Sequence, residues 1–418
     1  MDRIVVQGGA RLVGEVAVSG SKNSTLALMA SALLAEGETV LRNVPRVRDV
    51  DTMLQILEAL GARARWDERD AHTVRIDGRV TKPEAPYDLV RKMRASFLVL
   101  GPLVARFGCG RVSEPGGCAI GVRPVDQHLK GLEALGARIR LDHGYVEASA
   151  DRLTGARVAF DLTTVNGTQN VMMAATLAAG ETVLENAARE PEVSELARAL
   201  VAMGADVSGA GTDRIVVHGV RGLHGIDHDV AGDRIEAGTI LAAGLITRGD
   251  VTVLGVDTAT LETTIEKLRE MGAMLEVGAG RVRLVAEAPA RALRIVTAPY
   301  PGLATDMQAQ LMAVLTVASG SSVVTETVFE NRFMHVPELQ RMGADIALDG
   351  RSAHVRGVGS LSAAPVMATD LRASAGLLVA GLAADGETTV SRVYHIDRGY
   401  ERIEEKLRSL GAEIRREG

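Results

Sequence analysis

The sequence predicts an α/β protein built from six copies of one unit, grouped as two domains of three units each. Three observations support this prediction: a helix-ending Gly-Ala pair that recurs six times, a turn glycine that recurs six times between those pairs, and a length of 418 residues. Self-similarity at a fixed period indicates a repeat architecture. A chain of this length exceeds what one hydrophobic core supports, which favours two groups of three over one closed ring or an open solenoid.

The first recurring element is an apolar helical segment that ends in Gly-Ala and continues into a strand. The copy Leu-Glu-Ala-Leu-Gly61-Ala returns letter for letter as Leu-Glu-Ala-Leu-Gly136-Ala. Glycine directly after a helix adopts a positive φ without a Cβ clash and therefore ends the helix. The residues that follow alternate as a half-buried strand does. The glycines lie 68 to 75 residues apart, at Gly61, Gly136, Gly204, Gly272, Gly343 and Gly411.

The second recurring element is an Ala/Leu-rich helix, a turn glycine and a β-branched strand, as in Ala-Glu-Gly37-Glu-Thr-Val-Leu. Its glycines lie 66 to 72 residues apart, at Gly37, Gly108, Gly180, Gly249, Gly320 and Gly386. Each unit of about 70 residues therefore holds two helices and three or four strands.

The domain boundary is expected near residues 221–233, where Gly, His and Asp cluster between the third and fourth units. We expect one domain over 22–229 and a second over 1–21 plus 230–418, with a ligand site in the cleft between them. The strand at residues 3–6 precedes the first unit. We expect it to pair with the C-terminal half of the chain, so that the chain crosses twice between the domains.

The composition excludes several function classes. A net charge of −6 and a pI near 5.9 argue against bulk nucleic-acid binding. No apolar run of 18 or more residues is present, and the start of the chain lacks the pattern of a signal peptide, so no membrane span or export is expected. Cys109 and Cys118 form neither a disulfide framework nor a metal-ligand spacing. We therefore expect a cytoplasmic protein with no metal and no cofactor. A monomer is also expected, although composition and spacing do not determine the oligomeric state.

Cys118 lies in a segment whose glycines and proline will not continue a helix or a strand: Pro115-Gly-Gly-Cys118-Ala-Ile-Gly-Val-Arg123. A thiol becomes reactive when positive charge or a helix N-terminus is near. The alternative is a turn that contains one small apolar residue. The loop position and Arg123 favour a reactive thiol.

Lys22 lies on the first turn of a helix that begins after Ser19-Gly20-Ser21. Free backbone N–H groups beside an ammonium make an anion site. The alternative is an ordinary N-cap with a surface lysine. The phosphate-binding pattern Gly-x-x-x-x-Gly-Lys-Ser/Thr is absent, so ATP is not implied.

Further polar clusters fall at comparable places in other units, around predicted helix starts and strand ends. Asp306 lies at or near a helix N-cap, and Asp370 with Arg372 opens another helix. The alternatives are plain capping for the aspartates and a solvated face for the basic cluster around Arg94.

These clusters also predict the charge of the ligand. Convergence of the cationic side chains would be repulsive without a multiply anionic ligand, a phosphate, a carboxylate or both. A nearby thiol and carboxylate would supply acid and base. The cations are Lys22, Arg123, Arg332, Arg372 and Arg398.

Taken together, the motifs closely resemble the UDP-N-acetylglucosamine 1-carboxyvinyltransferases, a family of enolpyruvyl transferases, over essentially the whole chain. The matching motifs are Gly20-Ser-Lys22-Asn23, Pro115-Gly-Gly-Cys118, Thr305-Asp306-Met-Gln, Phe329-Glu-Asn-Arg332, Thr369-Asp370-Leu-Arg372 and His395-Ile-Asp-Arg398. The resemblance implies two inside-out α/β barrel domains, each made of three βαβαββ-type repeats.

The resemblance also implies the reaction. The enolpyruvyl group of phosphoenolpyruvate passes to the 3′-hydroxyl of UDP-N-acetylglucosamine, and phosphate leaves, through a phosphorylated tetrahedral ketal. This is the first committed step of peptidoglycan synthesis, which bears on cell shape and division, and members of the family take up fosfomycin on the loop cysteine.

Residue roles follow from the same resemblance. Cys118 is expected to be the general acid and to form a covalent phosphoenolpyruvate adduct, and Asp306 is the expected base. Lys22, Arg123 and Arg398 are expected to hold the phosphate and carboxylate of phosphoenolpyruvate. Contacts to the UDP-sugar are implied for Asn23, Arg94, Arg123, Pro124, Val125, Asp126, Gln127, Thr163, Thr164, Val165 and Val328. Arg332, Asp370 and Arg372 are expected to be inter-domain and active-site charges.

Three alternatives remain. A sister enolpyruvyl transferase acts on shikimate 3-phosphate, but it has no Pro-Gly-Gly-Cys loop. A non-catalytic UDP-sugar sensor should have lost Cys118, Asp306 or Lys22, and all three are present. A purely structural repeat protein does not explain a cysteine loop that occurs in one of six units.

Overall fold

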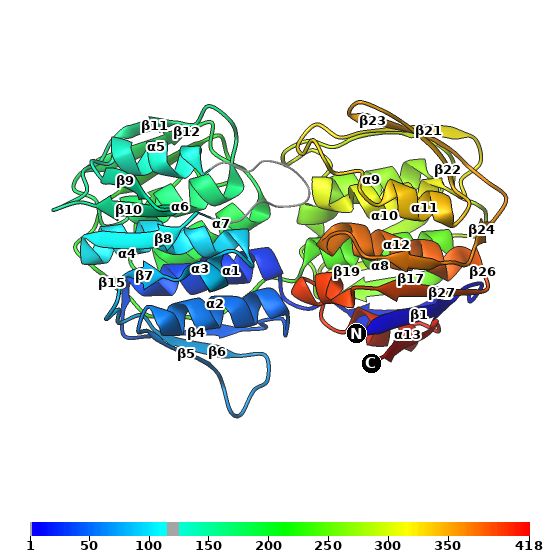
Figure 1. Ribbon diagram of the computed structural model, residues 1–418, viewed down its shortest axis with the longest axis horizontal. Helices are drawn as coiled ribbons and strands as arrows, with labels where there is room; N and C mark the ends of the chain where they lie inside the picture. The colour runs from blue at the N-terminus through cyan, green and yellow to red at the C-terminus, as the bar shows by residue number, and fades with distance from the viewer. Residues whose placement is uncertain (1, 115–124) are drawn as a thin grey trace. The chain divides into compact units, whose positions relative to one another are not determined.

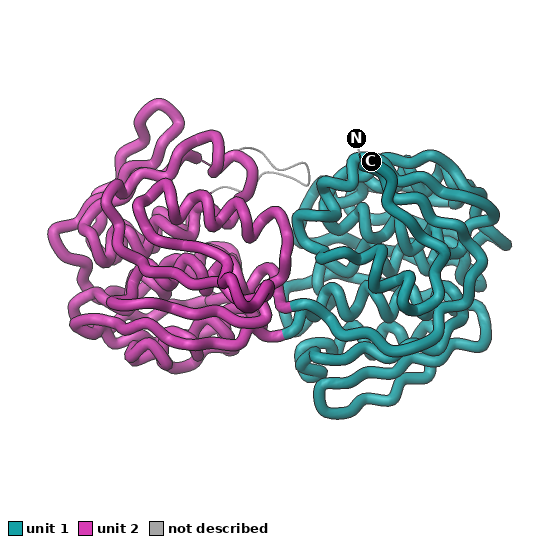
Figure 2. The backbone as a smooth tube through the Cα atoms, turned by 90° about the horizontal axis from the view of Figure 1, so that it is seen from below, with its two compact units in different colours: residues 1–19, 119–121, 232–418 teal, residues 20–118, 122–231 magenta. Residues whose placement is uncertain are grey.

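The computed structural model describes residues 2–114 and 125–418. Cys118, Arg123 and Pro124, which the sequence analysis assigned to the site, lie outside the described residues. The described chain forms two compact units (Figure 2). Unit 1 contains residues 2–19 and 232–418, and unit 2 contains residues 20–114 and 125–231.

Unit 2 alternates helices and short strands (Figure 1). Its helical elements are α1 (Lys22–Ser31), η1 (Ala32–Leu34), α2 (Arg48–Ala59), α3 (Tyr87–Val90), η2 (Arg94–Val99), α4 (Leu100–Phe107), α5 (Asp126–Ala134), α6 (Val165–Ala175) and α7 (Pro191–Ala202). Its strands are β3 (Ala35–Glu36), β4 (Glu38–Arg42), β5 (Arg63–Trp66), β6 (Val74–Asp77), β7 (Glu84–Ala85), β8 (Cys109–Ser113), β9 (Arg138–Asp142), β10 (Tyr145–Ser149), β11 (Arg157–Ala159), β12 (Glu181–Glu185), β13 (Asp206–Ser208), β14 (Arg214–His218), β15 (Leu223–His224) and β16 (Asp227–Asp229).

The four-stranded sheets of unit 2 share one topology. Their strand orders are β16-β4-β6-β5, β7-β8-β10-β9 and β11-β12-β14-β13, and in each the first two strands are parallel and the others antiparallel. The chain order β7-α4-β8-α5-β9-β10 is one βαβαββ repeat. The first sheet takes its parallel edge strand, β16, from the far end of the unit.

Unit 1 has the same plan. Its helical elements are α8 (Arg234–Ile246), η3 (Thr258–Leu261), α9 (Glu262–Glu270), η4 (Thr305–Met307), α10 (Gln308–Leu315), α11 (Val336–Arg341), α12 (Leu371–Ala383), η5 (Val393–Arg398) and α13 (Ile403–Ser409). Its strands are β1 (Arg3–Gln7), β2 (Val13–Ala17), β17 (Asp250–Leu254), β18 (Met274–Gly278), β19 (Arg281–Val285), β20 (Arg294–Val296), β21 (Ser321–Thr325), β22 (Asp345–Asp349), β23 (Ser352–Arg356), β24 (Leu361–Ser362), β25 (Pro365–Met367), β26 (Ala384–Asp385), β27 (Glu387–Ser391) and β28 (Glu413–Glu417).

The sheets of unit 1 confirm the pairing predicted for residues 3–6. The strand orders are β18-β19-β17-β2, β20-β21-β23-β22 and β25-β27-β1-β28. β1 lies antiparallel between β27 and β28, with Ile4 opposite Val390 and Val6 opposite Ile414. The six predicted repeats are therefore confirmed as six four-stranded sheets among the described residues.

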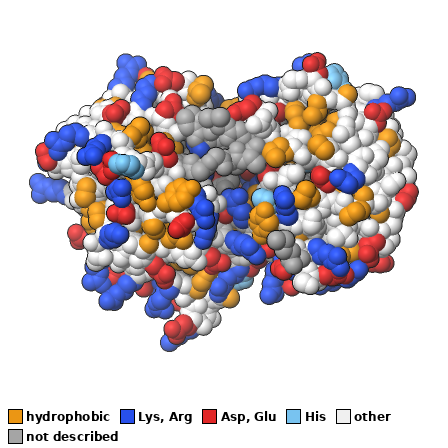
Figure 3. Space-filling model, in the orientation of Figure 1, with side chains coloured by type: hydrophobic (Ala, Val, Ile, Leu, Met, Phe, Trp, Pro, Cys, Tyr) orange, Lys and Arg blue, Asp and Glu red, His pale blue; other side chains and the backbone are white. Residues whose placement is uncertain are grey.

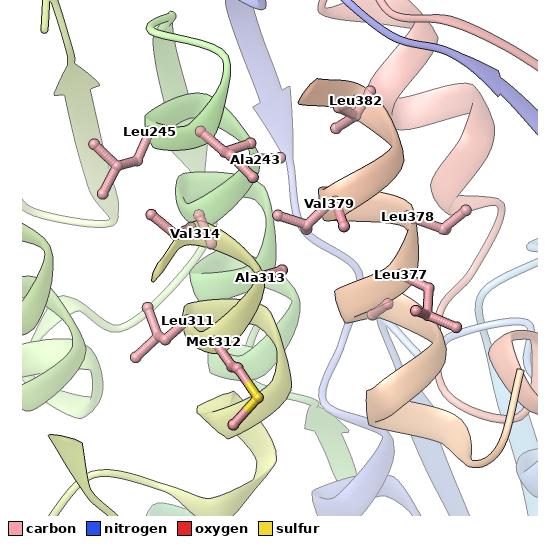
Figure 4. Packing of buried hydrophobic residues seen from close by; sticks show 14 of the residues in the cluster. Ala243, Leu245, Leu311, Met312, Ala313, Val314, Leu377, Leu378, Val379 and Leu382 are labelled. Carbon is pink, nitrogen blue, oxygen red and sulfur yellow. The ribbon is translucent and has the colours of Figure 1, made fainter. Parts of the chain in front are cut away.

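The interior of unit 1 is helical. Helices α8, α10 and α12 contact one another, and α8 is buried from Ile235 to Ile246. A helix that is apolar on every side needs burial on every side, which a position inside the sheets provides. Figure 4 shows apolar side chains of these helices close together, among them Ala243 of α8, Val314 of α10 and Val379 of α12. Unit 2 has its own apolar core. Together with the comparisons reported below, this arrangement confirms the predicted inside-out α/β fold.

The glycines that end the helices have the predicted geometry. The six Gly-Ala glycines have φ between +88° and +103°. Among the turn glycines, Gly249 differs, because its φ is not in the left-handed region. A Cβ at Gly249 would lie 2.3 Å from the Leu12 carbonyl oxygen, so close backbone packing is what requires glycine there. Within the described residues, no helix combines the length and apolarity that crossing a membrane requires.

Candidate active site

Lys22 is held by a buried aspartate in unit 2. Ser21 caps α1 by accepting the Ser24 N–H, which places Lys22 on the first turn as predicted, beside the half-buried Asn23. The Lys22 Nζ lies 3.1 Å from Asp49 Oδ2, and the two side chains are 13% and 4% exposed. The alternative of a solvated surface lysine is therefore wrong. Sequence reasoning missed Asp49, which lies in the first turn of α2, 27 residues from Lys22.

His128 has a fixed protonation state beside Arg94. The Gly101 N–H donates to Asn170 Oδ1 at 2.7 Å, so the Asn170 amide nitrogen must face His128 Nδ1, 2.9 Å away. That nitrogen donates, so His128 Nδ1 accepts and is unprotonated. Burial, with the Arg94 charge adding to it, lowers the pKa of His128 to about 3. Arg94 thus lies next to a neutral imidazole, at the start of η2.

Two of the predicted nucleotide-contacting segments are joined through Gln127. Its amide nitrogen donates to Asp126 Oδ2 at 2.9 Å and to Asp161 Oδ2 at 3.1 Å, and its oxygen accepts the Asp161 N–H at 2.9 Å. The start of α5, which follows Val125, is thereby fixed to the segment before α6. In that segment Thr164 caps α6, Thr163 bonds Asn186 at 3.0 Å, and Val165 begins the helix.

Asp306 lies between two buried arginines in unit 1. Arg332 Nη2 donates to Asp306 Oδ1 at 2.8 Å, and Arg372 Nε donates to Asp306 Oδ2 at 3.0 Å. The arginine side chains are 4% and 3% exposed, whereas the aspartate is 24% exposed. Asp306 lies within η4 and caps neither η4 nor α10, so the alternative of plain capping is wrong.

Asp370, His335 and His395 form the electrostatic surroundings of these arginines. Asp370 caps α12 by accepting the Arg372 and Ala373 N–H groups, as predicted. Burial lowers the pKa of His335 to about 4, with the Asp370 charge opposing the shift and Arg332 adding to it. Burial also lowers the pKa of His395, and the positive charge of Arg398 adds to that effect. Both imidazoles are therefore neutral near pH 7 and add no charge beside the cations.

Several buried polar atoms around this cluster have no hydrogen-bond partner among the described residues. They are Arg332 Nη1, Arg372 Nη1, Asp370 Oδ2, Thr369 Oγ1, His395 Nδ1 and both ring nitrogens of His335. A buried unsatisfied donor costs about 1–3 kcal/mol, and more when it is charged. The described residues offer no group of three or more His, Cys, Asp or Glu side chains suited to a metal ion.

Two other buried polar residues near these elements were given no role from the sequence. Tyr400 is 2% exposed, and its hydroxyl lies 3.0 Å from Thr239 Oγ1 and 3.1 Å from Gln310 Nε2, while its ring lies 5.1 Å from the Arg372 guanidinium carbon. Glu236, buried in the first turn of α8, pairs with Lys406. Burial raises the pKa of Glu236 to about 7, although Lys406 opposes the shift. Glu236 is a single polar residue inside an apolar helix and gives no periodic signal, and the burial of Tyr400, which lies between η5 and α13, depends on distant residues.

On the face drawn in Figure 3, basic and acidic side chains are intermingled over both units.

Comparison with known proteins identifies relatives over the whole chain. The model of the family described as EPSP synthase (3-phosphoshikimate 1-carboxyvinyltransferase) matches residues 6–407. A UDP-N-acetylglucosamine 1-carboxyvinyltransferase of Anaeromyxobacter sp. (strain Fw109-5) is 60% identical over 100% of both chains, and one of Myxococcus xanthus (strain DK1622) is 58% identical over 100% of both.

Solved structures agree with the fold. The enolpyruvyl transferase NikO from Streptomyces tendae is similar with a TM-score of 0.90 at 30% identity, over 99% of this chain and 98% of that one. An EPSP synthase from Acinetobacter baumannii is similar with a TM-score of 0.78 at 21% identity over 100% of both chains, which supports the fold alone.

Proposed function

The chain belongs to the EPSP synthase family, and we infer that it is an enzyme that transfers the enolpyruvyl group of phosphoenolpyruvate to the 3′-hydroxyl of UDP-N-acetylglucosamine, with release of phosphate. The observation that supports this most strongly is the 60% identity, over the full length, to a relative named for that acceptor. The EPSP synthase from Acinetobacter baumannii, a member of the group whose acceptor is a phosphoshikimate, is similar at only 21% identity. The UDP-sugar is therefore the better-supported acceptor.

Asp306 is the proposed base. Its carboxylate is fixed by Arg332 and Arg372 yet is still 24% exposed, so it can accept a proton from a hydroxyl placed beside it. In the addition step the hydroxyl proton goes to Asp306, the oxygen bonds to C2 of phosphoenolpyruvate, and the Cys118 thiol protonates C3. In the elimination step C3 returns a proton to the Cys118 thiolate, and phosphate leaves with the proton held by Asp306. Both groups end in their starting states.

The proposed anion site uses the cations of the matching motifs. Lys22, Arg123 and Arg398 would hold the phosphate and carboxylate of phosphoenolpyruvate, as the resemblance implies. The free Nη1 donors of Arg332 and Arg372 add fixed positive charge, which stabilises negative charge as it moves onto the leaving phosphate. No reorganisation is needed at that moment, because both guanidinium groups are already held by Asp306.

The proposed contacts to the UDP-sugar are those that the resemblance implies for Asn23, Arg94, residues 125–127, residues 163–165 and Val328. The Gln127–Asp161 hydrogen bonds support this assignment, since they fix two of these segments together before any ligand binds. The same proposal includes a role in peptidoglycan synthesis, and so in cell shape and division, in the cytoplasm, by a monomer.

The test is phosphate release from phosphoenolpyruvate with UDP-N-acetylglucosamine or with shikimate 3-phosphate, in the wild type, Cys118→Ser and Asp306→Asn. We expect release with the UDP-sugar only, and its loss in Asp306→Asn. Intact mass after fosfomycin treatment should show one added drug on the wild type and none on Cys118→Ser. Phosphate release with shikimate 3-phosphate would instead assign the protein to the enolpyruvyl transferases that act on that acceptor. No release with either acceptor from folded protein would favour the non-catalytic sensor.

A further inference from the structure

Glu326 is a buried carboxylate beside the proposed base that has no role in the mechanism above. It directly follows β21, at the carboxyl end of the parallel pair β20–β21, and it is 1% exposed. A carboxylate is rarely buried this completely unless its oxygens are satisfied by partners. Its partners therefore indicate what it holds in place.

One oxygen of Glu326 organises the turn that contains Val328. Oε1 accepts the Val328 N–H at 2.7 Å and the Phe329 N–H at 3.1 Å. It also accepts the Thr297 hydroxyl at 2.7 Å. Val328 is a proposed nucleotide contact, and the same segment continues to Arg332, a partner of Asp306. The conformation of this segment therefore depends on Glu326.

The other oxygen reaches the turn that contains the proposed base. Oε2 accepts the Thr305 hydroxyl at 2.8 Å, and Thr305 directly precedes Asp306 in η4. Every hydrogen bond recorded to Glu326 in the described part of the chain comes from a neutral donor, and no ion pair to it is recorded there. The carboxylate is thus a rigid link between two short segments rather than a member of the cationic cluster.

We propose that Glu326 is a positioning residue that fixes the base Asp306, through Thr305, relative to the nucleotide-contacting turn at Val328. This inference rests on the proposed function. Glu326 acts without touching the substrate. Holding a reacting group in its productive geometry accounts for large rate factors, and displacement by about 1 Å can cost about a hundredfold in rate.

The variants separate the two ends of the link. Thr305→Val removes only the hydroxyl on the Asp306 side, and Thr305→Ser restores it. Glu326→Ala removes both ends, and Glu326→Gln keeps the shape and one accepting oxygen. Glu338→Gln is the matched control, because Glu338 is also a buried glutamate of unit 1 that accepts a backbone N–H, from Met367 at 3.0 Å. For each protein we would measure kcat and KM for both substrates, the Kd of UDP-N-acetylglucosamine without phosphoenolpyruvate, and the thermal midpoint.

For Thr305→Val we expect kcat to fall about tenfold while the Kd of the UDP-sugar changes less than about twofold. Thr305→Ser should recover kcat to within about threefold. Glu326→Ala should lower kcat and raise the Kd together, each by about tenfold or more. Glu326→Gln should fall between the wild type and Glu326→Ala on both readouts.

Two results would overturn the inference: a folded Thr305→Val with wild-type kcat, or Glu338→Gln losing as much activity as the Glu326 variants. If the wild type itself releases no phosphate with the UDP-sugar, the proposed function fails, and this inference fails with it. If the wild type is active and the Thr305 and Glu326 variants keep its kcat, only the inference fails and the proposed function stands.

Discussion

The ammonium of Lys22 lies 3.1 Å from the carboxylate of Asp49, and the pair is largely removed from solvent. An ion pair in this setting is costly to break, because the remaining charge is left buried and uncompensated. The pair also orients the ammonium, which is proposed to bind the phosphate of phosphoenolpyruvate.

Asp49→Ala should therefore raise the KM for phosphoenolpyruvate by about tenfold and lower the free energy of unfolding by about 2–3 kcal/mol. Steady-state kinetics and urea unfolding measure the two effects. Asp51→Ala, an exposed aspartate in the same helical turn whose recorded bond is to Trp66, is the control and should leave the KM unchanged. Equal effects from both variants would mean that negative charge on this helix affects the KM in general. The Lys22–Asp49 pair would then have no specific role.

Tyr400→Phe should destabilise unit 1 by about 1–2 kcal/mol, because a buried hydroxyl between Thr239 and Gln310 is lost while the ring remains against Arg372. Guanidinium chloride unfolding measures the change. Tyr394→Phe removes the same atom from a side chain that is 40% exposed, and its effect should stay below about 0.5 kcal/mol. An unchanged free energy of unfolding in Tyr400→Phe would show that the hydrogen bonds among Tyr400, Thr239 and Gln310 add no net stability.

Glu236 should give the stability a negative slope with pH. Its pKa in the folded state is raised to about 7 from 4.5, mainly by burial, so the folded state binds more protons than the unfolded state between these values. The free energy of unfolding contributed by this group therefore falls as pH rises from about 4.5 to about 7, by about 3 kcal/mol in total.

Glu236→Gln should flatten that slope, and the difference between the two proteins in urea unfolding from pH 4.5 to 8 isolates it. Glu270→Gln, on an exposed glutamate of α9 paired with Lys267, is the control and should leave the slope as in the wild type. If the free energy of unfolding changes with pH in the same way in the wild type and in Glu236→Gln, the raised pKa of Glu236 is contradicted.

Gly37→Ala tests the backbone requirement without a steric clash. Gly37 has φ +90°, and a Cβ there would meet nothing within 4 Å. The strain of a left-handed alanine should cost about 1 kcal/mol. Gly222 is equally open but does not have a φ in that region. Gly222→Ala should therefore be neutral, or stabilising by up to about 1 kcal/mol, since it restricts the unfolded chain. Equal thermal midpoints for the two variants would contradict this account.

The repeat could be predicted from the sequence because its signals are local. Gly61 ends a helix whatever the rest of the chain does, and the same residues recur five more times. The motif residues were found for a similar reason: Ser21 and Asp370 cap helices that begin next to them.

What the sequence could not predict depends on contacts between distant residues. Lys22 meets Asp49 across 27 residues, and Asp306 meets Arg372 across 66. Glu326 joins Thr305 to Val328 only because β20 and β21 place their carboxyl ends side by side. No spacing in the sequence encodes these pairings, and the partners that bury Tyr400, Thr239 and Gln310, lie 161 and 90 residues away.

The sheets that receive a strand from far along the chain can be completed only late in synthesis. During translation residues 38–77 emerge early, but their sheet stays one strand short until β16, at Asp227–Asp229, leaves the ribosome. In unit 1 the delay is longer, since β1 is made first and its partners β27 and β28 are made last. The β1 segment of the nascent chain therefore stays without its partner strands for nearly the whole of synthesis. Unpaired segments of this kind are the ones that chaperones bind.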